Sequence, residues 1–411
     1  TATPEIYTLS LPDALPISTS PSPFSPMSLV EIEPALGGDG DLKELVAAAH
    51  ARGIRIIVDI VPHINRSSGH LPDSLSVYTY DDSGNLVVRA STDGRYGSWN
   101  DGKLLNYRKF EIWEWLSDSI DELIEKFDID GIRFDSAHAV PIMMKKNNFP
   151  FVFERKREPG DMVEGTIIVN DREDDHYVTT GYYDSACRDL IAVPLHYYLM
   201  LNVEKKIKEK GKNFFLNIAE CYWGHERFLT RTGLIPYNSS LFKICENIIH
   251  GKTDVREIYH IYDSYFPSSL PEGTEMLGIL GNHDERRALN TFGLRGLRAA
   301  VGLTCFMSNA IMDYEGSAEG EGWKVYLDNI FVNWNQFEYA AHRSLQPFYQ
   351  DWYRFHRHEK GKGYLVWANN TMVAAAAKFV GETIWIGVFN FADANQNVSI
   401  QFDSPVLPVP P

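Results

Sequence analysis

Amphipathic segments and short apolar runs alternate along most of the chain. Residues 41–53 place apolar side chains at helical spacing and end in a glycine, and the β-branched run at 54–61 follows as a predicted buried strand. The same order, helix and then strand, recurs at 109–127 with 131–135 and at 188–211 with 213–220. This repetition predicts an α/β fold in which right-handed helical crossovers connect parallel strands.

The pattern continues toward the C-terminus with three more predicted strands and two more helices. The strands are expected at 241–245, 276–280 and 310–316, and the helices at 297–307 and after residue 344. The count comes to about six parallel strands, whereas a closed α/β barrel has eight.

Two segments depart from this alternation. A polar stretch at 65–106, rich in Gly and Ser, contains a hairpin-like turn at 81–85 between two apolar runs and predicts a small inserted subdomain. From about residue 346, short alternating strands such as 383–389 predict the first part of a C-terminal β-sandwich that reaches the proline-rich end at 411.

Three of the predicted strands end abruptly in an acidic residue. The segments are Gly131-Ile-Arg133-Phe-Asp135, Asn217-Ile-Ala-Glu220 and Gly281-Asn282-His283-Asp284. A strand buried on both faces is apolar throughout, so an ionisable group at its carboxyl end lies at a mouth and not in the core. A single Asp after a strand is usually a helix cap or turn residue. Three carboxylates in order, two of them beside an Arg or a His, are instead the groups needed to cleave a glycosidic bond.

Composition narrows the class of partner. The 411 residues carry a formal net charge of −16, which argues against nucleic acid or an anionic membrane surface, because phosphate binding needs a basic face. Hydrophobic residues make up 44% of the chain, and none of the apolar runs is long enough to span a membrane. The four cysteines form no CxxC pair, as expected for buried, reduced thiols in a cytosolic protein.

At the three acidic segments the chain resembles the α-amylase family, glycoside hydrolase family 13, over roughly residues 22–345. The resemblance implies a (β/α)8 TIM barrel at 21–345, with the 65–106 subdomain inserted after the third strand and the partial β-sandwich at 346–411. Residues 1–20 resemble a translated sequencing adapter and are left out of the fold prediction. The family-like sequence begins at a segment similar to the loop after the second strand, so we expect the barrel to lack its first strand and most of its second.

The resemblance also assigns roles to individual residues. It makes Asp135 the nucleophile, Glu220 the acid/base and Asp284 the carboxylate that stabilises the charged sugar ring. Arg133 lies two residues before Asp135 and so on the same side of the strand, and we expect its guanidinium to keep the pKa of Asp135 low. Glu220 needs a raised pKa to carry a proton near neutral pH, which the apolar segment 221–223 could provide.

Four further residues match family positions around the sugar. His283 and Asn282 accompany the third carboxylate and are expected to bind the sugar at the cleavage point. Asp59 ends the third strand and is expected to pair with the arginine. His138 matches a His that flanks the acceptor side or a calcium loop, although a locally hydrogen-bonded His is an equally good interpretation.

The chain departs from the family pattern after Asp59. The family run ends in Asn-His, where the His binds the sugar and the Asn is often a calcium ligand, but here His63 and Ile64 occupy these positions and Asn65 follows. One sugar hydrogen bond is therefore expected to be missing, unless His63 or Asn65 replaces it. Calcium prefers oxygen ligands, so we assign no metal ligand and no cofactor, while calcium remains open.

The implied function is that of a retaining glycoside hydrolase acting on α-1,4-glucans such as glycogen, starch and maltooligosaccharides. A glucanosyltransferase with the same triad is one alternative, and a non-catalytic glucan-binding or regulatory module is another. The divergence after Asp59 favours a divergent subgroup over a secreted, starch-degrading amylase, and we expect a cytoplasmic location. The overall style of the sequence resembles bacterial amylase-like modules that are joined to glycogen or starch synthase domains. Because the first barrel strands have no counterpart, we expect this chain to be a poor or inactive catalyst on its own.

Overall fold

The computed structural model describes residues 25–76, 78–80, 86–88, 90–92, 98–103, 105, 107, 109–138, 165–169, 176–180, 185–222, 226–265, 276–323, 335, 342–361 and 363–401. The adapter-like residues 1–20 lie outside this part of the chain. The described residues form two compact units, taken one at a time below. The first unit runs to Glu220 and includes Phe228–Ile235, and the second consists of Cys221–Arg227 and the chain from Pro236 onward.

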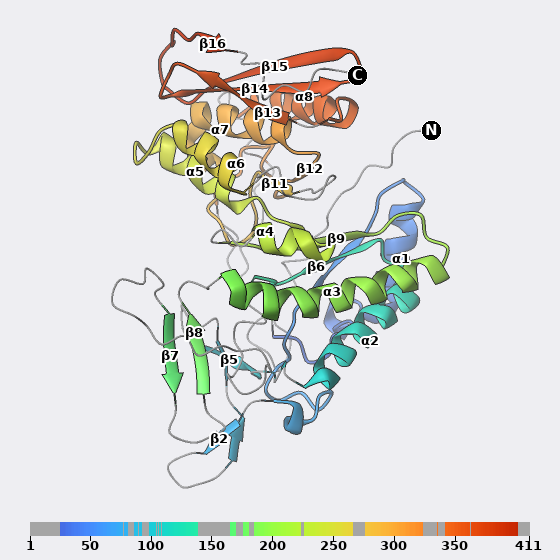
Figure 1. Cartoon of the computed structure of the whole chain (residues 1–411). Coiled ribbons are helices and arrows are strands. Elements are labelled where there is room, and N and C mark those ends of the chain that lie inside the picture. The colour runs from blue at the N-terminus through green and yellow to red at the C-terminus, as the bar shows by residue number, and fades with distance from the viewer. Residues whose placement is uncertain are drawn as a thin grey trace. The chain divides into compact units, whose positions relative to one another are not determined.

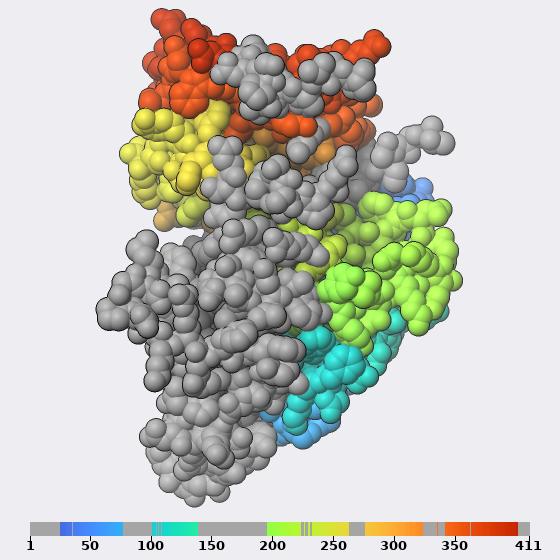
Figure 2. All heavy atoms as spheres, in the orientation of Figure 1, coloured from blue at the N-terminus to red at the C-terminus, as the bar shows by residue number. Residues whose placement is uncertain are grey.

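The first unit is built on a mainly parallel sheet beside three long helices (Figure 1). The sheet has the order β1 (Ile57–Ile60), β6 (Gly131–Phe134), β9 (Leu216–Ala219) and β10 (Ile235–Pro236), and β6 pairs in parallel with both β1 and β9. The helices are η1 (Pro34–Leu36), α1 (Gly38–His50), η2 (Asp73–Leu75), α2 (Phe110–Phe127), α3 (Ser185–Glu209) and η5 (Thr230–Thr232). Helix α2 contacts both α1 and α3, and Figure 2 shows α2 in cyan beside α3 in green. The three predicted helix–strand pairs of this region are thus confirmed.

Helix α2 shows how the apolar pattern produces a buried face. Its buried apolar residues recur at helical spacing: Ile112, Leu116, Ile120, Leu123, Ile124 and Phe127. The helix ends at Asp128, which adopts a left-handed φ of 56° and donates its N–H to the carbonyl of Ile124. The chain then turns directly into β6.

Strand β6 needs a glycine at its first position. A Cβ atom at Gly131 would lie 2.3 Å from the carbonyl oxygen of Leu216 on the neighbouring β9, a distance that two such atoms do not tolerate. All four residues of β6 are buried, as expected for a strand with a neighbour on each side.

Short antiparallel pairs occupy the region of the predicted insertion and the segment before α3. They are β2 (Tyr78–Tyr80) with β3 (Leu86–Val88), β4 (Ala90–Thr92) with β5 (Ser98–Lys103), and β7 (Gly165–Val169) with β8 (His176–Thr180). The first pair flanks the predicted turn at 81–85, so the predicted hairpin is confirmed, although the turn residues lie outside the described part. The boundaries of an inserted subdomain stay a prediction.

The elements of the second unit pack around one long helix, α7. Its elements are α4 (Glu226–Leu229, which ends in the first unit), α5 (Ser239–Ile249), α6 (Arg256–Tyr265), β11 (Leu277–Ile279), α7 (Ala288–Met307), β12 (Ala310–Met312) and α8 (Leu345–His358). Strands β11 and β12 pair in parallel, as predicted, and Tyr237 forms a parallel bridge to Leu277. Helix α7 contacts α5, α8 and both strands, and its path breaks at Gly293, where φ is 63°.

The predicted strand at 241–245 is wrong, because these residues belong to helix α5. Asn238 caps this helix by accepting the N–H of Leu241, and the buried Leu241, Cys245 and Ile248 repeat at helical spacing. A five-residue apolar window does not distinguish a buried strand from the buried side of a helix. The short strand β10 lies a few residues earlier and outside the predicted range.

An antiparallel sheet follows α8 in the second unit. It has the order β15 (Thr383–Asn390), β14 (Val373–Val380), β13 (Gly363–Ala368) and β16 (Ile400–Gln401), and it lies against α7 (Figure 1). Residues 374–377 of β14 are four consecutive alanines with 0% exposure. Because the described residues contain one such sheet and the C-terminal residues 402–411 lie outside them, the predicted sandwich stays a prediction.

Three of the four cysteines can be checked. Cys221, Cys245 and Cys305 are buried, as expected, and burial raises the pKa of Cys245 to about 12. The side chain of Cys187 lies outside the described residues. None of the helices that the structure describes is both long enough and apolar enough to cross a lipid bilayer.

Candidate active site

The carboxyl ends of β1, β6 and β9 bring three acidic residues to one edge of the first unit's sheet. Asp59 of β1 lies opposite Arg133 of β6, and Asp135 and Glu220 directly follow β6 and β9. The N–H of Asp135 binds the carbonyl of Ile60 at 2.9 Å, and the N–H of Glu220 binds that of Phe134 at 3.0 Å. The parallel ladder therefore continues to both acidic residues and fixes their backbones.

One guanidinium connects the three carboxylates. The Nη1 atom of Arg133 lies 2.9 and 2.8 Å from the two oxygens of Asp59 and 2.7 Å from Oδ1 of Asp135. Its Nη2 atom lies 3.0 Å from Oε2 of Glu220. The side chains of Arg133, Asp135 and Glu220 are only 6, 10 and 9% exposed, so little water screens these charges. The predicted partnership of Arg133 with Asp59 and Asp135 is confirmed, and its contact with Glu220 is an addition.

The turn after β6 supplies further contacts to Glu220. The backbone N–H of Ser136 donates to Oε2 of Glu220 at 2.6 Å, and Nδ1 of His138 lies 3.2 Å from the Glu220 carbonyl oxygen. Ser136 adopts a left-handed φ of 45°, one of two positive values among the described non-glycine residues. His138 is buried and makes this local hydrogen bond, in agreement with the second of its two interpretations.

The pKa values of the two central carboxyls run opposite to our expectation. Burial raises the pKa of Asp135 well above its usual range, and the negative charge of Glu220 raises it further, against the attraction of Arg133. Burial would also raise the pKa of Glu220, but the charges of Arg133 and His138 and the N–H of Ser136 outweigh it and lower the pKa. The two buried carboxyls influence each other, so the pKa of Asp135 is raised while that of Glu220 is lowered. We expected the reverse order because the sequence does not reveal the donors around Glu220.

The third predicted carboxylate belongs to the second unit and follows β11. Asn282 is buried, and its Oδ1 accepts the N–H groups of Asp284 at 3.0 Å and Glu285 at 2.9 Å. Its Nδ2 donates to the hydroxyl of Tyr222 at 2.8 Å, and Nε2 of His283 lies 3.4 Å from Oδ2 of Asp284. The Asp284 side chain is 51% exposed, in contrast to the buried pair of the first unit. Asn282 thus shapes the turn that presents Asp284.

After Asp59, where the sequence departs from the family pattern, Asn65 forms hydrogen bonds within its own loop. Its Nδ2 donates to Oγ of Ser25 at 3.1 Å, and its Oδ1 accepts the N–H of Ser67 at 2.8 Å. Asn65 therefore stabilises its own loop, which disfavours it as a replacement for the missing sugar ligand. Ile64 is fully buried and His63 is 6% exposed. Among the described residues there is no cluster of three acidic, His or Cys side chains that could hold a metal ion.

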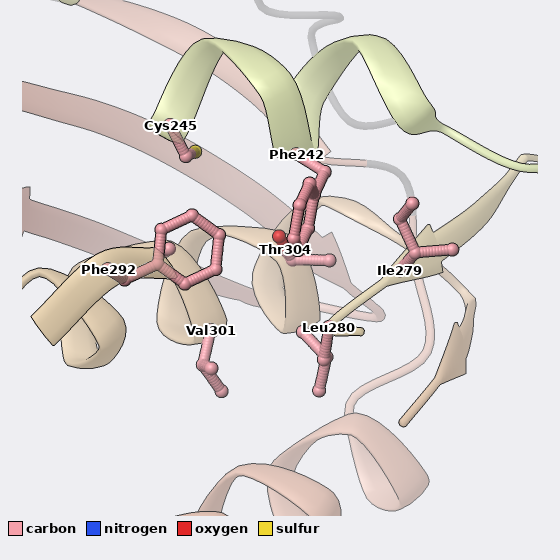
Figure 3. A pocket seen from close by; sticks show the side chains of 8 residues that line it. Phe242, Cys245, Ile279, Leu280, Phe292, Val301 and Thr304 are labelled. Carbon is pink, nitrogen blue, oxygen red and sulfur yellow. The ribbon is translucent and has the colours of Figure 1, made fainter. Parts of the chain in front are cut away.

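An apolar pocket in the second unit does not fit a ligand site. It lies between α5, α7 and the end of β11, and its lining consists of Phe242, Cys245, Ile279, Leu280, Phe292, Val301 and Thr304, labelled in Figure 3, together with Ala300. The rings of Phe242 and Phe292 meet edge to face at 5.0 Å, and no room is left for a water molecule. This is an apolar packing gap in the core of the unit.

Sequence reasoning missed two groups that bind the predicted residues. The N–H of Ser136 is a backbone donor whose direction depends on a left-handed turn, and the sequence carries no signal for it. The hydroxyl of Tyr222 holds Asn282 from a segment that we interpreted as apolar surroundings for Glu220. Trp223 of the same segment lies outside the described residues.

Comparisons with known proteins connect this geometry to a family. No family model matches the chain. The chain is 31% identical over 122 residues to a 1,4-alpha-glucan-branching enzyme of Debaryomyces hansenii, an alignment that covers 30% of this chain and 16% of that enzyme. It is 21% identical over 345 residues to Maltase A1 of Drosophila melanogaster, covering 74% of this chain and 56% of the maltase. The chain therefore matches about one sixth and about half of the lengths of these two relatives.

The fold is that of α-amylase-type TIM-barrel proteins. A noncanonic maltogenic alpha-amylase, AmyB from Thermotoga neapolitana, superimposes with a TM-score of 0.63 at 16% identity, over 92% of this chain and 75% of that protein. A cyclomaltodextrinase gives a TM-score of 0.65 at 16% identity, over 92% and 58%. In sequence the chain is similar to parts of a glucan-branching enzyme and a maltase, and in fold to amylase-type enzymes. These are proteins of the α-amylase type, glycoside hydrolase family 13, which the three acidic segments also resemble.

Proposed function

We propose that this chain carries the site of a retaining enzyme acting on α-1,4-linked glucans, with Asp135 as nucleophile and Glu220 as acid/base. The observation that carries the proposal is the pair of buried carboxyls on adjacent nitrogens of one guanidinium, at the carboxyl ends of neighbouring parallel strands. Such a pair supplies both groups of a double displacement. The family resemblance adds Asp284 as the third carboxylate, and His283 and Asn282 as sugar ligands.

In the proposed reaction, an oxygen of Asp135 attacks the anomeric carbon while the bond to the leaving oxygen breaks. Glu220 gives its proton to that oxygen, and a water or sugar hydroxyl later returns a proton to Glu220 as it displaces Asp135. This requires an ionised Asp135 and a protonated Glu220, so bound substrate has to reverse the order of the two pKa values.

Hydrolysis and glucanosyl transfer use the same residues in this proposal. They differ in whether water or a sugar hydroxyl accepts the glycosyl unit, and the relatives include both a branching enzyme and a maltase. Product analysis on maltooligosaccharides, with and without added maltose, distinguishes them. A transferase forms chains longer than the substrate, and added maltose increases their yield.

A non-catalytic glucan-binding module is the second candidate. The observation in its favour is the raised pKa of Asp135, because the proposed nucleophile has to be ionised in order to attack. In that case the chain would bind maltooligosaccharides, leave them uncleaved and form no covalent adduct. The link to a synthase domain and the cytoplasmic location stay predictions.

Covalent trapping tests the proposal even if turnover is slow. A ring-fluorinated α-glucosyl fluoride needs no proton for departure, and its glycosyl ester hydrolyses slowly, so a single event per molecule is detected by mass spectrometry. We expect one glucosyl unit on the peptide that contains Asp135, none in Asp135→Asn, and full labelling in the control Asp128→Asn, whose exposed side chain lies before β6. Binding without labelling of any carboxylate would support the non-catalytic module instead.

A further inference from the structure

The turn that follows Asp135 is strained and reaches toward Glu220. Ser136 has a φ of 45°, which L-amino acids rarely adopt, and its N–H donates to Glu220 at 2.6 Å. Such a backbone persists only where surrounding contacts hold it in place. Two of the contacts of this turn, those of Ser136 and His138, end on Glu220 itself.

A third contact comes from a different element. His196 of α3 is 0% exposed, and its Nε2 lies 2.9 Å from the carbonyl oxygen of Ala137 in the middle of the turn. Its ring also meets the ring of Phe134 edge to face, with centroids 4.9 Å apart. One imidazole therefore contacts the chain on both sides of Asp135, which lies between Phe134 and Ala137.

The protonation and hydrogen bonding of His196 show why this position holds an imidazole and not an apolar side chain. Burial lowers its pKa to about 4, so the ring is neutral near neutral pH and has one N–H. Nε2 must carry that hydrogen to donate to the Ala137 carbonyl. Nδ1 is buried without a hydrogen-bond partner among the described residues, a cost that an apolar side chain of similar size avoids. Packing alone does not explain the imidazole, whereas the hydrogen bond to the turn does.

We infer that His196 is a positioning residue, which holds the turn of residues 136–138 from behind so that the Ser136 N–H points at Glu220. The inference rests on the proposed role of Glu220. Loss of the donor on α3 lets Ser136 relax to a negative φ, and the N–H then turns away from the carboxylate. Glu220 thereby loses one of the hydrogen bonds that stabilise its ionised form.

Three substitutions at position 196 separate the hydrogen bond from the packing. In His196→Gln, the side-chain amide nitrogen reaches the place of Nε2 and can donate to Ala137. In His196→Asn, the amide nitrogen corresponds to Nδ1 and does not reach, and His196→Leu keeps bulk without a donor. We expect the labelling rate with the fluorinated fluoride to fall by about 10- to 100-fold in the Asn and Leu variants and by less than about threefold in the Gln variant.

A second-site change tests the strain directly. Glycine adopts a positive φ without cost and keeps its N–H, so adding Ser136→Gly to His196→Leu should restore most of the lost labelling rate. Equal rates in His196→Gln and His196→Asn would overturn the inference, and so would a double variant no faster than His196→Leu. The melting temperature of each variant is measured alongside. If His196→Leu does not fold, the labelling rates of the Gln and Asn variants still test the inference.

A readout without turnover separates this inference from the proposed function. The carboxyl carbon of Glu220 is followed by NMR in protein labelled with ¹³C-glutamate, with Glu220→Gln to assign its signal. We expect its pKa to rise in His196→Asn and to stay at the wild-type value in His196→Gln. If wild-type protein forms no adduct, the proposed function fails while this titration still tests the role of His196. An unchanged Glu220 pKa in all variants contradicts the inference.

Discussion

Asp130 anchors the strand that carries Arg133 and precedes Asp135, and its removal should loosen that strand. The side chain is 0% exposed and lies immediately before β6. Its Oδ1 accepts a hydrogen bond from Nη1 of Arg55 at 2.9 Å, and its Oδ2 accepts the N–H of Ile56 at 3.0 Å and lies 2.7 Å from Nε2 of His50. One carboxylate thus ties the start of β6 to α1 and to the chain entering β1.

The expected cost of Asp130→Asn follows from these contacts. The amide oxygen retains one acceptor for the Ile56 N–H, but the charge that pairs with Arg55 and His50 is lost. These partners are 34 and 26% exposed, so water screens part of each interaction. We expect a loss of about 2–3 kcal/mol, near the lower end of what breaking a buried, charge-assisted pair costs.

The loss should also depend on pH. Burial raises the pKa of Asp130, but the hydrogen bonds from Ile56 and His50 and the charges of His50 and Lys212 outweigh it, so the folded-state pKa is lowered. A lowered pKa stabilises the fold above the unfolded value, about 3.9, and this contribution disappears as the pH falls through the folded value. The difference between wild type and variant should therefore be full at pH 7 and shrink below about pH 4.

Hydrogen exchange at the amides of β1 and β6 measures this loss within the first unit. At pH 7 a loss of 2–3 kcal/mol corresponds to about 30- to 150-fold faster exchange. Asp128→Asn is the matched control, because that side chain is 61% exposed and asparagine suits its left-handed φ. Equal exchange in the two variants would show that the Asp130 contacts contribute little and refute the reasoning.

Three further predictions concern the paired carboxyls, the packing of β6 and the second unit. In the assays above, Asp135→Asn should cost several orders of magnitude in rate, and Glu220→Gln should be rescued on substrates whose leaving groups need no proton; near-normal turnover of the Asn variant would eliminate the proposed nucleophile. Gly131→Ala should destabilise the first unit by about 1–3 kcal/mol in urea unfolding, since its Cβ would lie 2.3 Å from a β9 carbonyl, whereas Gly40→Ala on α1 meets nothing within 4 Å and should be neutral or stabilising. Burial raises the pKa of Asp313 to about 6, so its contribution to stability is present below about pH 4 and lost as the pH rises through 6. Asp313→Asn should therefore reduce the change in melting temperature between these pH values. A variant whose melting temperature varies with pH as in the wild type would contradict this prediction.

Most of the elements and the identity of the acidic residues could be predicted from the sequence alone. The helix–strand order up to β9 follows from local periodicity. The acidic residues at the ends of three apolar segments can be identified from the sequence without a structure. The pairing of Arg133 with Asp135 also follows from the strand period of two. The hairpin of β2 and β3 was predictable because its signal is a short turn between two apolar runs.

Other features depended on contacts between segments far apart in the chain. The run at 241–245 is helical because Asn238 caps it and its apolar side packs against α7, which a short apolar window does not show. The order of the Asp135 and Glu220 pKa values was mispredicted because Arg133 of β6 and Ser136 in the turn after it both interact with Glu220. A pKa depends on the three-dimensional arrangement of charges and donors, whereas a motif records only which groups are present. The sequence by itself therefore determined the family resemblance and the acidic residues that carry it, and the tertiary structure decided the direction in which the pKa of each carboxyl shifts.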